Sequence, residues 1–133
     1  DGVGGILGQA GPTVIADQGG FWLSTRGQMQ FESADLPAME SSGSFLFVIE
    51  HEMAHVMGFG TLWTDNGVYV NGSGQYIGAL AAARTEFGVP DATFIPVELG
   101  GGSGTADSHW DELDGVVRAV PRSRAARGMR LLN

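Results

Sequence analysis

The sequence predicts a mixed α/β fold in one domain, with extended segments in its first third and a helix at its centre. Residues 28–32 alternate polar and apolar side chains, as a half-exposed strand does. Residues 45–49 are apolar without alternation, which favours a helix buried on most sides. Residues 76–87 are rich in Ala and predict a second helix. At 133 residues the chain is long enough to bury a core.

The first thirty residues predict extended structure and turns. Residues 12–16 are a short apolar piece that fits a strand or a loop, and residues 21–23 lead through a break at Gly27 to the alternating segment. We expect that segment to be an edge strand with one face on the core. The alternative is an edge strand that pairs with an extended peptide by β-augmentation. The residues that would then bind substrate are Gln28, Met29, Gln30 and Phe31.

The central helix lies between residues typical of helix ends. Residues 33–37 predict a turn before it. The serines that follow this turn offer side chains that can cap the helix N-terminus, and they are Ser41, Ser42 and Ser44. Gly58 is a natural left-handed terminator at the other end.

Loops dominate the second half of the predicted chain. Residues 64–75 form a polar loop with Gly and Asn, and the Ala-rich helix of residues 76–87 follows. Residues 93–98 predict a short strand or extended run. A flexible Gly-rich loop at 99–105 then leads to His109.

Charge divides the chain unevenly. All fifteen acidic residues lie at or before Asp114 with only two of the seven arginines, so residues 1–114 carry a net charge of −13 and residues 115–133 carry +5. The acidic body argues against a nucleic-acid partner. The basic tail could be a nucleic-acid or membrane arm, but a solvated tail or a foreign segment is favoured.

Several absences also bound the protein. Without Cys, a metal ion can be held only by His and carboxylates. No stretch is long and apolar enough to be a transmembrane segment, and no signal peptide is recognisable. Because the chain starts at Asp1 rather than Met, we expect a processed product or a fragment.

The central helix carries the pattern His-Glu-x-x-His at His51, Glu52 and His55. Positions four apart lie only about 40° apart around a helix, so both imidazoles can hold one zinc ion. Glu52 is rotated off that line, where it can reach a metal-bound water as general base. The alternative is a core helix whose histidines hydrogen-bond internally, which would bury two imidazoles and a carboxylate at a high cost.

A catalytic zinc site normally has three protein ligands and one open position. The chain has three histidines, and His109 is the one left after His51 and His55. We favour His109 as third ligand, with a carboxylate as the alternative. The candidates for that alternative are Glu86, Glu98 and Glu112.

Residues 51–59 resemble the opening of the metzincin motif, with Gly58 in its expected place. The short form of the motif has its third His where this chain has Thr61. The arrangement is instead similar to the leishmanolysin family, in which a long insertion separates that glycine from the third His. Other stretches also resemble bacterial leishmanolysin-like sequences, so the resemblance covers about residues 1–112. They are residues 1–12, 29–31, 33–36, 60–63 and 108–110.

This resemblance implies a secreted or cell-surface zinc endopeptidase that cuts polypeptides. It implies His51, His55 and His109 as ligands, Glu52 as base, and a substrate cleft along the edge strand. The implied fold is a metzincin-like twisted mixed sheet with a backing helix, the active-site helix and a loop-rich C-terminal subdomain, truncated here. Within a single catalytic domain over residues 1–133, the expected parts are an upper subdomain, an insertion with the third ligand, and an atypical tail. Their bounds are 1–58, 59–114 and 115–133.

The family's Met-turn sequence is missing after Trp110, and Met129 is the only later methionine. We therefore expect residues from about 115 onward to come from a shifted reading frame or an unrelated end. The rival function is a non-catalytic metal-binding module or an inactive protease fragment. Tyr69 and Tyr76 could stabilise an oxyanion, although packed surface tyrosines are favoured. Calcium in the Gly-rich loops is possible, but no loop motif supports it.

Overall fold

The structure is a computed structural model that describes residues 3–78 and 93–111. These residues belong to two compact units; the described part of the first ends at Thr61, and the second begins at Leu62. The first unit contains β1 (Gly8–Asp17), β2 (Trp22–Phe31), α1 (Leu36–Ser42) and α2 (Phe45–Met57). The second contains β3 (Gln75–Tyr76) and β4 (Ile95–Pro96). The mixture of helices and strands expected from the sequence is confirmed.

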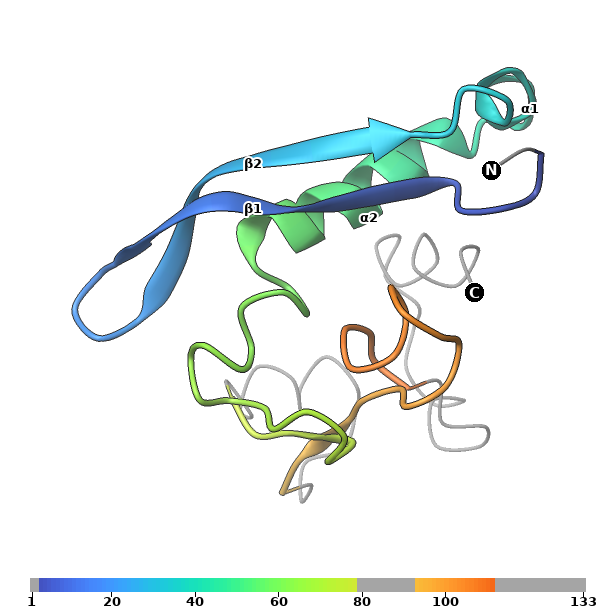
Figure 1. Ribbon diagram of the computed structural model, residues 1–133. Coiled ribbons are helices and arrows are strands. Elements are labelled where there is room, and N and C mark those ends of the chain that lie inside the picture. The colour runs from blue at the N-terminus through green and yellow to red at the C-terminus, as the bar shows by residue number, and fades with distance from the viewer. Residues whose placement is uncertain (1–2, 79–92, 112–133) are drawn as a thin grey trace. The chain divides into compact units, whose positions relative to one another are not determined.

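Strands β1 and β2 form an antiparallel hairpin, and α2 lies along it (Figure 1). The register runs from Gly8 opposite Phe31 to Asp17 opposite Trp22. Gly27 of β2 allows the helix to approach closely, because a Cβ there would lie 2.6 Å from Cγ1 of Val56 in α2. Glycine in a strand often marks such a close approach. Gly27 is therefore part of the strand and not the break that the sequence predicts.

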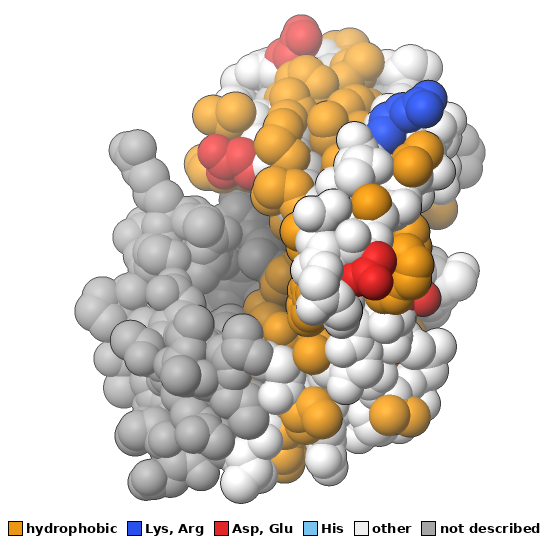
Figure 2. Space-filling view, turned by 90° about the vertical axis from the view of Figure 1, so that its left-hand side faces the viewer, with side chains coloured by type: hydrophobic (Ala, Val, Ile, Leu, Met, Phe, Trp, Pro, Cys, Tyr) orange, Lys and Arg blue, Asp and Glu red, His pale blue; other side chains and the backbone are white. Residues whose placement is uncertain are grey.

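The two halves of the hairpin differ in how they are covered. Near α2, strand β2 alternates between half-buried and exposed residues, and Gln28 and Gln30 are exposed. Toward the closed end the alternation stops, and large apolar side chains are exposed. They are Val14, Ile15, Phe21, Trp22 and Leu23. The closed end points toward the viewer in Figure 2, where hydrophobic side chains appear between polar ones.

Helix α1 occupies residues for which the sequence predicts a turn and a lead-in. Its N-cap position is Asp35, and a proline stands in its first turn, where the ring is compatible with a helix. Gly43 ends the helix in the left-handed conformation, with φ of 74°. Ser41 and Ser42 lie in or at the end of this helix, so they are not caps of α2 as expected. Ser44 is the N-cap residue of α2, but its side chain makes no capping hydrogen bond.

Helix α2 confirms the predicted central helix and its glycine terminator. Gly58 has φ of 112°, and the N–H of Phe59 donates to the carbonyl of Ala54 at 2.9 Å. This pattern satisfies carbonyl groups that would otherwise be left open at the helix end. The expectation of burial on most sides is wrong, since Leu46 is 61% and Met57 65% exposed. The buried positions lie on one face, namely Val48, Glu52 and His55.

The second unit is mostly loop, as predicted. Its strands β3 and β4 are antiparallel, so neither sheet in the described ranges is the expected mixed sheet. Tyr76 lies in β3, which contradicts a helix starting there; residues 79–87 of that predicted helix lie outside the described residues. An aromatic cluster packs this unit, with ring centroids 4.8–4.9 Å apart. Its members are Trp63, Tyr76 and Trp110.

Across residues 3–78 and 93–111, none of the helices combines the length and the apolar character needed to cross a membrane.

Candidate metal centre

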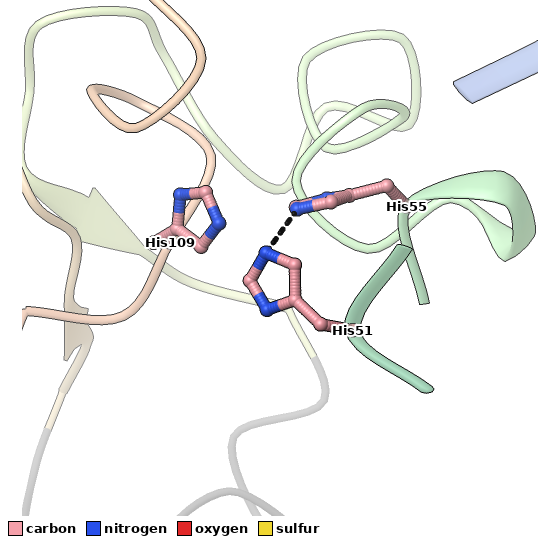
Figure 3. Close-up of side chains that lie close together, drawn as sticks. All are labelled: His51, His55 and His109. Carbon is pink, nitrogen blue, oxygen red and sulfur yellow. Dashed lines mark hydrogen bonds between the residues drawn. The ribbon is translucent and has the colours of Figure 1, made fainter. Parts of the chain in front are cut away.

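His51 and His55 extend from the same side of α2, as their spacing predicts (Figure 3). Their Nε2 atoms are 3.1 Å apart and hydrogen-bonded to each other, and their ring planes are inclined at 84°. This is the internal hydrogen bond of the alternative interpretation, and the same spacing also bears on metal binding. Two nitrogens bound about 2.0–2.1 Å from a tetrahedral zinc ion would lie roughly 3.3–3.4 Å apart. The observed spacing is therefore close to one edge of a zinc coordination sphere.

The ring of His55 is held in one tautomer by the turn after the helix. Its Nδ1 lies 2.9 Å from the carbonyl oxygen of Phe59. A carbonyl can only accept, so the neutral ring carries its hydrogen on Nδ1 and presents a lone pair on Nε2. Metal-binding histidines usually have this arrangement, in which the second nitrogen donates to a carbonyl or carboxylate.

Thr61 occupies the position at which the short metzincin pattern has its third histidine, and its side chain has a different structural role here. Its Oγ1 donates to the carbonyl oxygen of His55 at 2.7 Å. That carbonyl belongs to the last turn of α2, where backbone acceptors lack partners within the helix. Thr61 therefore completes the helix end instead of serving as a ligand.

His109 is held in a tautomer of the same kind. The side chain is 7% exposed, and its Nδ1 lies 3.0 Å from the carbonyl oxygen of Thr105. The Oγ atom of Ser108 is 3.2 Å from the same nitrogen. Because the Thr105 carbonyl only accepts, the neutral ring again carries its lone pair on Nε2.

His51, His55 and His109 could together hold a metal ion, and each offers one ring nitrogen (Figure 3). His51 and His55 belong to the first compact unit and His109 to the second. Of the alternative third ligands, Glu98 is described and is not part of this group, whereas Glu86 and Glu112 lie outside the described residues. Met129, the Met-turn candidate, also lies outside them, as does the basic tail of residues 115–133.

Glu52 lies on the buried face of α2 and is 5% exposed. Burial raises the pKa of its carboxyl group to about 7. Gly8 of β1 lies against it, because a Cβ at Gly8 would be 2.8 Å from Oε1 of Glu52. Within the described part of the chain, Oε2 has no hydrogen-bond partner. The general-base role stays a prediction, but a buried carboxyl group with a raised pKa is suited to proton transfer near neutral pH.

The predicted substrate residues Gln28 to Phe31 lie in β2, opposite Gly8 to Gly11 of β1. Gln28 and Gln30 are exposed, and Met29 and Phe31 are half-buried. Their role in binding a peptide stays a prediction. The residue found against Glu52 is instead Gly8 of β1, which the sequence did not single out.

Tyr69 and Asp107 form a contact that the sequence did not reveal. Tyr69 is 2% exposed, so it is not a packed surface tyrosine, and its hydroxyl donates to Oδ1 of Asp107. Burial and this bond raise the pKa of Tyr69, and the same bond lowers the pKa of Asp107. Burial also raises the pKa of Tyr76. The available signal in the sequence was Asp107, two positions before His109. Its partner Tyr69 could not be recognised, because it lies 38 positions away.

Comparisons with known proteins give one informative match. The chain is 32% identical over 78 residues to a leishmanolysin homolog from Crithidia fasciculata, which covers 47% of this chain and 11% of that protein. This match indicates a distant leishmanolysin-like relationship. The chain spans about a tenth of the length of that relative. No family model matches the sequence. No solved structure matches it either.

Proposed function

We propose that the chain is the catalytic part of a zinc-dependent endopeptidase, with His51, His55 and His109 as zinc ligands. The observation that carries the proposal is the Nε2 spacing of 3.1 Å between His51 and His55. The fixed tautomers of His55 and His109 support it, since in both rings Nδ1 donates a hydrogen bond to a backbone carbonyl oxygen. Three neutral imidazoles suit zinc, and this set would leave a fourth position for water or substrate.

In this proposal, Glu52 is the general base. Its carboxylate takes a proton from the attacking water and then delivers that proton to the leaving amine. Zinc, when bound, would polarise the peptide carbonyl and lower the pKa of the water. The burial of Glu52 supports this role, because few water molecules then compete for the carboxylate. The substrates would be polypeptides, and an extended peptide could lie along the hairpin strands.

The distant match to a leishmanolysin homolog supports the same proposal from sequence. By this relationship we propose a secreted or cell-surface location. The strongly acidic body keeps nucleic acid an unfavourable partner. Among residues 3–78 and 93–111, the group of side chains that could hold a metal ion consists of three histidines. No group of acidic side chains in these ranges supports a calcium site.

The test combines metal analysis with a cleavage assay on the full chain. We expect one zinc per chain and cleavage of a denatured protein that stops with a chelator and returns with added zinc. Glu52→Gln should retain zinc and lower the cleavage rate by about a hundredfold or more. Glu50→Gln is the matched control, because Glu50 is exposed on the same helix. Zinc binding without cleavage would favour the non-catalytic metal-binding module, and absence of stoichiometric zinc would refute both.

A further inference from the structure

The backbone around His109 is paired with the segment that begins in β4. Val97 forms an antiparallel bridge with Trp110, and the N–H of Glu98 donates to the carbonyl oxygen of His109 at 3.0 Å. The N–H of Asp107 donates to the carbonyl oxygen of Glu98 at 2.8 Å. These bonds fix the main chain on both sides of His109.

Asp107 is the point where this main chain turns. Its φ of 65° is left-handed, and no other non-glycine residue in the described ranges has a positive φ. Asp tolerates this conformation better than most residues, although it still costs energy. Asp107 lies between Thr105 and His109, so this turn lets the His109 ring meet the carbonyl of Thr105.

The Asp107 side chain attaches this turn to a distant loop. Its Oδ1 accepts hydrogen bonds from the Tyr69 hydroxyl and from the N–H of Gly72, the latter at 2.8 Å. Tyr69 is a rigid anchor, because it is buried and its ring packs edge-on against Trp63 with centroids 5.9 Å apart. The N–H of Gly74 also points to the Tyr69 hydroxyl at 3.4 Å.

We propose that Tyr69 and Asp107 are positioning residues for His109, holding the turn in which its Nδ1 meets Thr105 and its Nε2 is presented as a ligand. This inference rests on the proposed zinc site. It assigns to the polar loop before β3 a role in ligand geometry that its sequence does not show. Groups that orient a ligand in this way typically change metal affinity by about 10–100-fold when removed.

The test measures zinc affinity of the full chain by competition with a chromophoric chelator. Tyr69→Phe removes the hydroxyl and keeps the ring, and Asp107→Gly keeps the left-handed φ but removes the acceptor. Both should weaken zinc binding by about tenfold or more. Asp107→Asn keeps an acceptor oxygen and tolerates the same φ, so it should bind zinc nearly as the unaltered chain does. Tyr76→Phe, in the neighbouring aromatic cluster, is the matched control and should leave affinity unchanged.

A second measurement separates positioning from general destabilisation. In a His109→Ala background, Tyr69→Phe should cause no further loss of zinc affinity, since the effect passes through His109. Cobalt(II) bound in place of zinc should show weaker visible absorption in Tyr69→Phe, while circular dichroism of the metal-free variant stays unchanged. Equal losses with and without His109, or a loss that follows unfolding, would overturn the positioning role.

The outcomes also separate this inference from the function on which it rests. If the unaltered chain binds no stoichiometric zinc, the proposed function fails before any variant is compared. If the unaltered chain binds zinc and Tyr69→Phe binds it equally well, only the positioning role fails.

Discussion

The candidate ligands come from two kinds of structure. His51 and His55 stand one turn apart on α2, and the helical repeat alone brings their Nε2 atoms to 3.1 Å. His109 stands in a loop, where its position depends on pairing with Glu98, on the turn at Asp107 and on the carbonyl of Thr105. All three rings are partly or fully buried.

This difference shows two ways to fix the position of a candidate ligand. The helix determines a spacing locally, so a four-residue pattern in the sequence is sufficient to read it. The loop needs several hydrogen bonds from residues up to 38 positions away, as between Tyr69 and Asp107. Both regions nevertheless reach the same end state, in which Nδ1 meets a carbonyl oxygen and Nε2 carries the lone pair.

The largest effect should come from removing a candidate ligand. This test asks whether His109 contributes as much to zinc affinity as a histidine of the helix. We expect His51→Ala and His109→Ala each to lower zinc affinity by about a thousandfold or more, because a few ligands share a binding free energy of roughly 10–16 kcal/mol. Zinc content after dialysis against a weak chelator measures this. If His109→Ala kept full zinc content, His109 would not be equivalent to the helix histidines. The third ligand would then be sought among Glu86, Glu98 and Glu112.

The next effect concerns the buried carboxyl group of Glu52, which lies between His51 and His55 in the sequence of α2. The Glu52 pKa is raised from 4.5 to about 7 in the folded chain. Between these values the unfolded chain loses its proton first, so stability falls as pH rises from about 4.5 to 7 and stays lower above 7. Without solvent screening this difference would correspond to about 3 kcal/mol, and screening lowers it, so about 3 kcal/mol is an upper bound. Metal-free Glu52→Gln should therefore be more stable than the unaltered chain at pH 8, by up to that amount, and similar to it at pH 4.

Urea unfolding of the metal-free proteins at both pH values measures this difference. Glu50→Gln, on the exposed side of the same helix, should show no such gain. A pH-independent difference between Glu52→Gln and the unaltered chain would argue that the Glu52 carboxyl group is not buried in solution.

A smaller effect is expected from β1, whose Gly8 lies against Glu52. Gly8→Ala would place a Cβ 2.8 Å from Oε1 and displace the carboxyl group. We expect a fall in cleavage rate of about 10–100-fold with zinc retained, because small displacements of reacting groups are costly. Gly11→Ala in the same strand is the control, since its Cβ would meet Thr61 at 3.9 Å. Equal cleavage rates for the two variants would show that the space at Gly8 does not matter for the position of the Glu52 carboxyl group.

The smallest effect concerns the end of α2. Thr61→Val removes the hydroxyl that donates to the His55 carbonyl and should lower the free energy of unfolding by about 1 kcal/mol. Thr64→Val is the control, because its hydroxyl donates to the exposed side chain of Asn71 and not to a helix end. Urea midpoints compare the two. A Thr61→Val chain as stable as the Thr64→Val chain would show that the helix end does not depend on this bond.

The sequence predicted those parts of the fold that have local causes. The central helix, its end at Gly58 and the strand around Gln28 to Phe31 follow from apolar runs, alternation and one glycine. Strand β1 was harder to recognise, because Gly8 and Gly11 weaken the pattern where α2 approaches. Helix α1 was missed because Asp35 and Pro37 read as a turn, although both residue types also suit a helix start.

The candidate site divides in the same way. His51, Glu52 and His55 were predicted from their spacing on one helix. His109 was chosen because it was the remaining histidine, and no pattern in the sequence showed the turn that holds it. The sequence singled out Tyr69 only as an oxyanion candidate, and its contact with Asp107, 38 positions away, could not be found from the sequence. Nor could the contacts of Thr105 with His109 and of Gly8 with Glu52, since each depends on the folded backbone.

The Thr61 hydroxyl also suggests a route to a shorter protein. Because residue 61 directly follows the turn that carries Phe59, a histidine placed there would give up a helix-end bond and offer a nitrogen only six positions after His55. Two imidazoles would then compete for a single coordination position. If the nearer one prevailed, residues 62–108 would no longer be needed to position the proposed ligand His109, and a shorter engineered chain could omit them.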